Sequence, residues 1–156
     1  MRKHKHKPID DFSTRVVLRT PRNRFVITFD PRKDERDFPG GKRKSSERDY
    51  RATGRRECLE EVGVTVRFNQ IELLSKTVQP AKAKAARPAR DAKKHYHLYF
   101  CQAFVTDAQV DDGFPVSKEH ELVEVVTRAE LIHFIRTGAF SATSARLAEQ
   151  HGLLNE

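Results

Sequence analysis

The sequence is poor in the residues that would build a disulfide framework, a cysteine-rich metal site or a membrane span. Its only cysteines are Cys58 and Cys101, too few for a disulfide framework or for a zinc site of four clustered ligands. No run of eighteen apolar residues is present, which excludes a membrane-spanning helix. The basic N-terminus has no apolar run behind it, so no secretory signal is predicted, and a reducing cytoplasm is the simplest compartment.

Acidic charge is also in short supply. The chain has 30 Lys and Arg residues against 22 Asp and Glu residues, which gives a formal net charge of +8. Basic residues near the N-terminus contribute +4, and residues 82–94 contribute +5. The rest of the chain is therefore near neutral and carries two basic appendages. These segments can concentrate polyanions by long-range attraction, or they can be solvated segments that aid solubility.

The 156 residues suit one domain with a core of its own. Residues 1–12 are interpreted as a basic, disordered N-terminal arm, and residues 13–156 as a single domain with a basic loop at 79–94. Strands are predicted at 13–19, 24–29, 64–68, 71–78, 95–105 and 121–126, helices at 48–62, 127–137 and 142–151, and loops at 31–37 and 107–118. Both faces of the strand at 95–105 are substantially apolar, as in a sheet covered on both sides. This order predicts an α/β fold in which helices cover a mixed sheet.

A cluster of acids gives the first indication of chemistry. Three glutamates, Glu57, Glu60 and Glu61, would share one face of a helix within about 100°. The opposite face would be apolar and would hold Cys58, Leu59 and Val62. Such crowded carboxylates repel each other, and a hard divalent cation such as Mg²⁺ or Mn²⁺ would supply the compensating charge. The plain alternative is a solvated acidic face on which Arg56 pairs with Glu60 at i, i+4 spacing.

Glycines stand on both sides of this cluster. Gly40 and Gly41 follow Pro39, and two glycines allow a loop to turn sharply and its backbone to approach a ligand closely. Gly63 stands where a helix C-terminus favours a residue that tolerates positive φ. Glu47 lies between the two groups of glycines.

Together these residues resemble the signature of the Nudix hydrolases, G-x5-E-x7-R-E-U-x-E-E-x-G-U, in which U is a bulky apolar residue. Its fixed positions are filled by Gly41, Glu47, Arg56, Glu57, Cys58, Glu60, Glu61, Gly63 and Val64. Two departures are present: eight residues rather than seven separate Glu47 from Arg56, and the small Cys58 fills the first U. The resemblance implies an α/β/α sandwich with a mixed sheet.

The resemblance also implies the members of a site. The catalytic residues would be Glu60, Arg56, Glu57 and Glu61. The metal ligands would be Glu57, Glu60 and Glu61, joined from a later segment by Glu121, with Glu119 as the alternative to Glu121. The substrate would contact Gly40, Gly41 and Lys42. The expected cofactor is Mg²⁺, with Mn²⁺ as the alternative.

The implied activity is hydrolysis of the pyrophosphate linkage in a nucleoside diphosphate linked to another group X, with water activated by carboxylates. The partner would be a nucleotide or other polyphosphate small molecule, or the 5′ end of an RNA, since residues 82–94 would suit a highly anionic ligand. The alternative is a basic nucleic-acid or nucleotide-binding module on a catalytically idle Nudix scaffold. No membrane partner is predicted, and both a monomer and a homodimer are left open.

Overall fold

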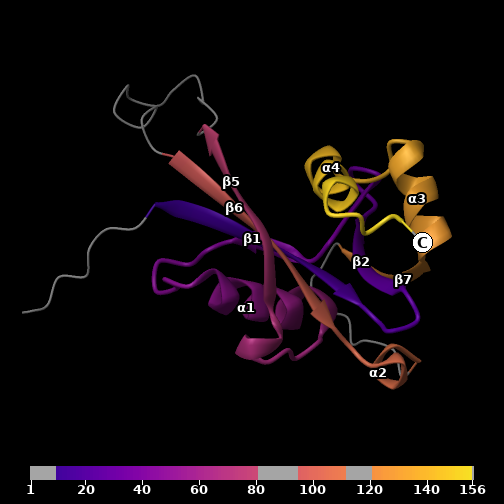
Figure 1. The fold of residues 1–156 in the computed structure, drawn as a ribbon, viewed down its shortest axis with the longest axis horizontal. Helices are drawn as coiled ribbons and strands as arrows, with labels where there is room; N and C mark the ends of the chain where they lie inside the picture. Colours follow the sequence, from indigo (N-terminus) through magenta and orange to yellow (C-terminus); the bar gives the residue numbers. More distant parts are fainter. Residues whose placement is uncertain (1–9, 81–94, 112–120, 156) are drawn as a thin grey trace, which may run out of the picture.

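The computed structural model of the chain describes residues 10–80, 95–111 and 121–155. The strands are β1 (Asp11–Arg19), β2 (Arg24–Asp30), β3 (Glu35–Asp37), β4 (Gly40–Lys42), β5 (Glu72–Pro80), β6 (His95–Phe104) and β7 (Leu122–Thr127). The helices are α1 (Tyr50–Val62), α2 (Asp107–Asp111), α3 (Arg128–Arg136) and α4 (Ala142–Gln150), with a 3-10 helix η1 (Phe68–Gln70). Figure 1 shows the long strands crossing the middle of the molecule between α1 and the pair α3 and α4.

The strands of the described ranges form one sheet of seven strands. Its main path runs β3-β2-β1-β6-β5, while β4 pairs with β1 and β7 pairs with β2. β1 and β6 are parallel, from Asp11 opposite Tyr96 to Arg19 opposite Phe104. The other strand pairs are antiparallel. The sheet is therefore mixed, as predicted.

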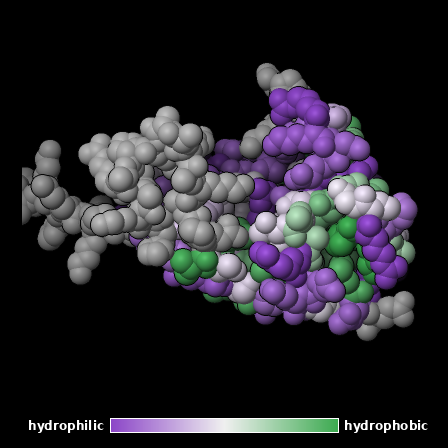
Figure 2. Space-filling view, turned by 90° about the horizontal axis from the view of Figure 1, so that it is seen from above, coloured by the Kyte–Doolittle hydropathy of each residue, from purple (hydrophilic) through white to green (hydrophobic). Residues whose placement is uncertain are grey.

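Helices cover both faces of the sheet. Neighbouring residues of a strand point to opposite faces, so one strand contributes side chains to the cores on both sides. Val16 of β1 lies in one core with Val62 of α1. Val17, the next residue, lies in a second core with Leu131 of α3 and Leu147 of α4. The predicted α/β/α sandwich is confirmed. Seen from the side of α3 and α4, the surface is mainly hydrophilic with a smaller apolar area (Figure 2).

Strand β6 is buried on both faces, as predicted. Leu98 and Phe100 belong to the core beneath α3 and α4. Cys101 and Ala103 belong to the core beneath α1. Cys101 and the other cysteine, Cys58, are buried free thiols.

The prediction of a strand at 64–68 is wrong. Residues 64–67 make no strand ladder and lead into η1. Val64 and Val66 are buried in the core beneath α1, whereas Thr65 and Arg67 are exposed. The alternation of apolar and polar residues therefore reflects burial of every second side chain. Here the buried side chains pack against helix α1, and no neighbouring strand is needed.

Other boundaries also differ from the sequence prediction. β1 begins at Asp11, within the stretch expected to be a disordered arm, because Phe12 is buried against the ring of Tyr99. The loop predicted at 31–37 contains β3, and the loop predicted at 107–118 begins with α2. The predictions for residues 1–9, residues 81–94 and Glu119 lie outside the described residues. In the described ranges, no helix combines the length and the apolar character needed to cross a membrane.

Candidate active site

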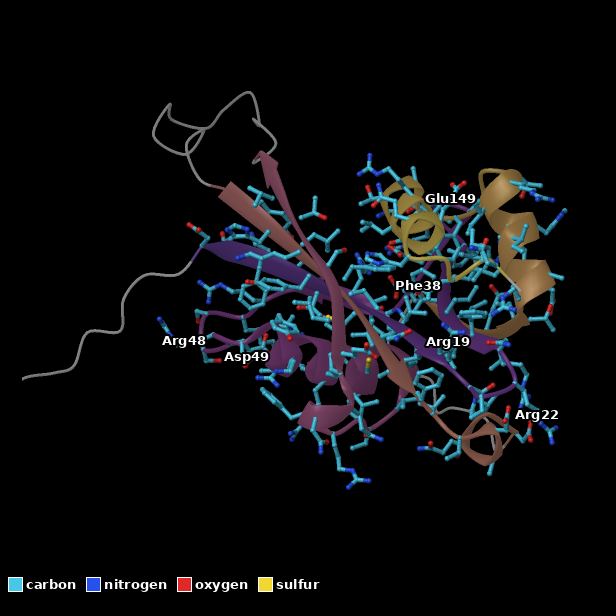
Figure 3. The ribbon with its side chains drawn as sticks, in the orientation of Figure 1. Arg19, Arg22, Phe38, Arg48, Asp49 and Glu149 are labelled. Carbon is cyan, nitrogen blue, oxygen red and sulfur yellow. The ribbon has the colours of Figure 1, made fainter. Side chains whose placement is uncertain are left out.

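Helix α1 positions the predicted acids, and both of its ends are capped. Asp49, labelled in Figure 3, accepts a hydrogen bond from the backbone N–H of Arg51 (2.8 Å). At the other end, Gly63 has a φ of 69° and donates its N–H to the carbonyl of Leu59 (3.0 Å). Because glycine adopts this left-handed conformation without strain, the predicted helix end is confirmed.

The face of α1 that packs on the sheet carries two of the three acids. Glu57 and Glu61 are each only 5% exposed, beside the fully buried Cys58 and Val62. Leu59, by contrast, is 53% exposed. The prediction that the acids lie opposite an apolar face is therefore wrong, because two of them share the buried face and Leu59 points to solvent. Burial of carboxylates costs free energy, so their place under the helix indicates a use beyond packing.

Glu57 and Glu61 line a cavity of about 430 Å³, which we call the acid hollow. Its lining includes six of the predicted site residues: Glu57, Glu61, Glu121, Gly40, Gly41 and Lys42. These residues come from α1, from β4 and from the position before β7, so segments distant in sequence meet at one cavity. Glu60 and Arg56 lie outside this lining and border it from α1.

The two glycines of β4 provide room where the chain is crowded. A Cβ atom at Gly40 would lie 2.2 Å from the carbonyl oxygen of Thr14, on the neighbouring β1. A Cβ atom at Gly41 would lie 2.6 Å from Oε1 of Glu57. The two glycines lie in a short paired strand rather than in the sharp turn that the sequence suggested, and the close approach to a ligand stays a prediction. Gly41 thus determines how near the backbone of β4 comes to a carboxylate of the acid hollow.

Arg56 joins several acceptors along the edge of the acid hollow. Its Nε and Nη2 donate to the two carboxylate oxygens of Glu47 (2.9 and 3.0 Å). Its Nη1 donates to Oε1 of Glu57 (2.8 Å) and to Oε2 of Glu60 (3.1 Å). Nη2 also donates to the carbonyl of Lys42 (3.0 Å). The guanidinium therefore fixes α1 to β4 and to the segment that precedes the helix.

Glu47 reaches this network despite the extra residue in the spacing. Its Oε1 also accepts hydrogen bonds from the backbone N–H of Lys44 (2.8 Å) and from the hydroxyl of Thr53 (3.1 Å). Burial raises the pKa of Glu47, but these bonds and those from Arg56 outweigh burial and hold it below its ordinary value. The same pairing, led by the hydrogen bond to Glu47, raises the pKa of Arg56. Glu47 is thus an ionised, fully compensated carboxylate.

Glu60 occupies the rim. Its side chain is 40% exposed, and the i, i+4 pair with Arg56 that the sequence suggested is present at 3.1 Å. Its other oxygen, Oε1, lies 3.7 Å from Nζ of Lys44. Among the residues that the structure describes, one carboxylate oxygen is therefore held by a guanidinium, while the other has only a longer contact with a lysine.

Glu61 is in the opposite electrostatic situation. Burial raises the pKa of Glu61 well above its ordinary value, and a hydrogen bond with Glu57 and the negative charges of Glu57 and Glu121 raise it further. Two carboxyl groups that share a hydrogen bond need a proton between them, or a cation in its place. Burial and the neighbouring acids therefore outweigh Arg15, whose positive charge lowers the pKa of Glu61.

The donor set of the acid hollow fits a hard divalent cation. Carboxylate oxygens are the ligands that Mg²⁺ and Mn²⁺ prefer. Oε2 of Glu121 is buried and has no hydrogen-bond partner among the described residues, so it is a donor atom without another role in that part of the chain. Within the same residues, no three acidic, histidine or cysteine side chains form a ready-made metal cluster. The carboxylates therefore line a common cavity without already converging on one point.

Sequence reasoning missed several polar residues that line the acid hollow, among them Asp30 and Arg15. Asp30 is the last residue of β2, and its carboxylate is held by Arg32 (3.2 Å). Arg15 lies in β1, and its Nη1 donates to the carbonyls of Phe38 and Gly40 (3.1 Å each). An acid at the end of an apolar strand is a signal that could have found Asp30. Nothing in the local pattern distinguishes Arg15 from other strand arginines, because its place depends on the pairing of β1 with β4.

In sequence, residues 11–146 match the family model of the NUDIX domain. The chain belongs to the Nudix family. This membership confirms the family and the enzyme class expected from the sequence, a Nudix pyrophosphohydrolase. No curated protein matches the sequence.

Two solved structures resemble the fold at low sequence identity. A MutT/nudix family protein from Enterococcus faecalis is 16% identical with a TM-score of 0.52, and the match covers 80% of this chain. This chain spans only 47% of that protein's length. A C. elegans Ap4A hydrolase, in a binary complex, is 18% identical with a TM-score of 0.56, over 92% of this chain and 91% of the other. At these identities the likeness concerns the fold, and it agrees with the observed α/β/α sandwich.

Proposed function

We propose that this Nudix protein is a metal-dependent hydrolase that cleaves the pyrophosphate linkage of a nucleoside diphosphate linked to another group X. The observation that carries the proposal is the buried pair Glu57 and Glu61, which lines the acid hollow together with the glycine strand β4. A fold does not need two adjacent carboxylates at 5% exposure, and their mutual repulsion favours a ligand that brings positive charge.

Glu57, Glu61 and Glu121 would hold the cation, with Glu60 as a further ligand at the rim. A bound Mg²⁺ or Mn²⁺ ion neutralises phosphate charge and lowers the pKa of water, which is the chemistry that a shielded pyrophosphate requires. The chain's own contribution is to keep these oxygens together in a narrow space. Arg56 does so from outside by donating to Oε1 of Glu57, which fixes the orientation of that carboxylate.

Glu60 is the best-placed candidate for the general base. Arg56 holds its Oε2, so the carboxylate has a defined orientation, and Oε1 is left to accept the proton of the attacking water. Its position at the rim also gives the accepted proton a direct path to solvent. Glu57 and Glu61 are less suited to this step, because each is needed to balance positive charge inside the acid hollow.

The substrate would be held by backbone and by positive side chains. Lys33, Lys42 and Arg15 line the acid hollow beside its carboxylates, so anionic phosphates meet positive charge as well as negative charge there. The backbone of Gly40 and Gly41 can approach a phosphate closely because neither residue carries a Cβ atom. The likeness to an Ap4A hydrolase favours dinucleoside polyphosphates among the candidate substrates, which also include nucleoside triphosphates and the 5′ end of an RNA.

The decisive test is hydrolysis of a substrate panel in the presence of Mg²⁺ or Mn²⁺. The panel holds nucleoside triphosphates, ADP-ribose, dinucleoside polyphosphates, inositol pyrophosphates and 5′-triphosphorylated RNA, and the variants are Glu60→Gln and Glu61→Gln. Glu149→Gln, at an exposed position near the end of α4, is the matched control (Figure 3). We expect metal-dependent turnover of one class, lost in both site variants and kept in the control.

A different result would favour the binding module. Absence of turnover on every member, together with tight, salt-sensitive RNA binding that the site variants leave unchanged, contradicts the hydrolase proposal. The cytoplasmic location and the choice between monomer and homodimer stay predictions from the sequence.

A further inference from the structure

A second, smaller cavity adjoins the acid hollow. It has a volume of about 190 Å³ and lies between the start of β6, strand β1 and the beginning of α4. Five hydroxyl-bearing residues line it, and we call it the hydroxyl chamber: Ser13, Tyr96, Ser141, Thr143 and Ser144. Arg15 and Asp37 line both cavities, so these two side chains stand at the boundary between them.

The hydroxyl chamber differs from the acid hollow in its charge. Asp37 is its only acid among the described lining residues, and this carboxylate is already occupied. Its Oδ1 accepts hydrogen bonds from the hydroxyl of Ser144 (2.5 Å) and from the backbone N–H of Phe38 (2.8 Å), and its Oδ2 lies 3.5 Å from Nη1 of Arg15. What the chamber offers a ligand is therefore hydroxyl groups rather than net charge.

Those hydroxyls retain hydrogen-bonding capacity. Each hydroxyl has one donor and two acceptor positions, so a single internal bond leaves others for a ligand. The hydroxyls of Ser13 and Tyr96 are bonded to each other, and that of Ser141 accepts from the backbone N–H of Ser144 (3.4 Å). Thr143 makes no side-chain hydrogen bond with any described residue. Groups that both donate and accept are suited to the hydroxyls of a sugar or polyol.

Arg15 connects the two cavities chemically. All its hydrogen bonds and its ion pair within the described residues use Nη1, which contacts the carbonyls of Phe38 and Gly40 and the carboxylate of Asp37. A guanidinium has five N–H donors in a planar fork, so the edge formed by Nε and Nη2 is left for a ligand. Anchored at one corner, this cation is ready to bind a phosphate oxygen at the boundary.

We propose that the hydroxyl chamber binds a hydroxyl-rich ring of the group X, such as a pentose, while Arg15 binds the phosphate that joins this ring to the scissile linkage. The inference rests on the proposed function, because it places that phosphate against the acid hollow. Pockets that enclose a whole small ligand measure about 300–1,000 Å³, so a chamber of about 190 Å³ suits one substituent rather than a complete nucleoside. A sugar or polyol carried on the diphosphate is therefore the favoured substrate class.

The test measures binding and does not depend on turnover. Ribose 5-phosphate and inorganic phosphate are titrated calorimetrically into the full chain with Mg²⁺ present. Ribose 5-phosphate has no pyrophosphate linkage to hydrolyse, and it presents both the phosphate and the hydroxylated ring. We expect it to bind at least about tenfold more tightly than inorganic phosphate, because only it can use the hydroxyl chamber.

Variants assign that difference to the chamber. The double change Tyr96→Phe with Thr143→Val removes two hydroxyls and little volume, and it should weaken ribose 5-phosphate binding about tenfold while leaving phosphate binding unchanged. Arg15→Lys, which loses the planar fork, should weaken both probes. The control, Tyr99→Phe with Thr65→Val, makes the same chemical changes elsewhere and should alter neither.

The outcomes separate this inference from the proposed function. Equal affinity of the two probes for the unmodified protein, binding of neither, or equal weakening of both by the chamber variant overturns the hydroxyl chamber as a subsite. If the protein hydrolyses a member of the substrate panel but gives one of these results, the hydrolase proposal stands and the subsite proposal is wrong. If the protein shows the predicted binding differences but hydrolyses no member of the panel, the subsite proposal stands and the hydrolase proposal is wrong.

Discussion

Two glutamates, Glu47 before helix α1 and Glu61 within it, show how the same side chain is used in opposite ways. Glu47 has a side chain 12% exposed and is surrounded by donors, with Arg56 binding both its oxygens, and its pKa lies below the ordinary value. Glu61 is 5% exposed, and the groups that raise its pKa further are two more acids, Glu57 and Glu121. The first carboxylate is neutralised by the protein itself, whereas the second lies among further acids and, under the proposed function, would be neutralised by a bound cation.

The two glutamates separate the part of the signature that holds the site together from the part that we propose binds the cation. Glu47 and Arg56 bind each other and other groups of the chain. They therefore stabilise the fold and orient the carboxylates of Glu57 and Glu60. Under the proposed function, Glu61 belongs to a cluster of acids whose mutual repulsion a bound cation would relieve. Removing charge at the two positions should therefore have opposite effects on folding, and this contrast can be tested.

The largest expected effect follows from Glu61→Gln. We expect kcat/KM with Mg²⁺ to fall by about 100-fold or more, because the acid hollow loses a charged oxygen donor. The folded-state pKa of Glu61 is raised, so its contribution to stability is present below its unfolded pKa and is lost as pH rises through the folded pKa. Glutamine cannot ionise, and the metal-free variant should therefore melt at least about 2–4 °C higher than the unmodified chain at pH 7.

Steady-state kinetics and metal-free calorimetry check this pair of outcomes, with Glu149→Gln as the exposed control. A variant that loses activity and also melts lower would show that Glu61 is a structural residue whose charge the fold compensates. That result would remove the distinction between the two glutamates.

The next effect comes from the paired substitutions Gly41→Ala and Gly40→Ala. A Cβ atom at Gly41 meets the movable end of Glu57, so we expect kcat/KM to fall about tenfold or more with a small change in melting temperature. A Cβ atom at Gly40 meets the backbone carbonyl of Thr14 at 2.2 Å and cannot be accommodated without shifting β1 against β4. Gly40→Ala should therefore lower stability by about 1–3 kcal/mol.

Chemical denaturation and kinetics on both variants separate the two effects. Equal loss of stability in the two variants would mean that Gly41, like Gly40, serves only to pack β4 against β1. The same pair also tests whether β4 controls the position of a carboxylate in the acid hollow.

Much of this arrangement could be predicted from the sequence, because periodicity and spacing report local structure well. The helix around the acids, its end at Gly63, the two apolar faces of β6 and the sandwich follow from such patterns. The burial of Glu57 and Glu61 could not be predicted in this way, since period alone assigns acids to the solvent side. Arg15 was missed because its role arises from a contact between β1 and β4 that no local pattern encodes.

A smaller effect is expected from Glu47→Gln, which changes the compensated carboxylate. Arg56 would keep its guanidinium charge but lose its bidentate partner, and hydrogen bonds to charged groups are worth about 1.5–3 kcal/mol. We therefore expect the unfolding free energy at pH 7 to fall by about 1–3 kcal/mol, opposite in sign to Glu61→Gln. Urea denaturation measures the change, and an unchanged or increased stability would contradict the closed network around Arg56.

The smallest expected effect is the pH dependence of the difference in unfolding free energy between the unmodified chain and Glu47→Gln. Because the folded pKa of Glu47 is depressed, its contribution to stability is complete above its unfolded value of 4.5 and is lost as pH falls through the folded pKa. The gap in unfolding free energy between the unmodified chain and Glu47→Gln should therefore be constant near neutral pH and shrink on acidification below pH 4.5. Urea titrations of both proteins at several pH values measure this gap. A gap that widened in acid would place the folded pKa of Glu47 above its ordinary value, and Glu47 would then resemble Glu61 rather than contrast with it.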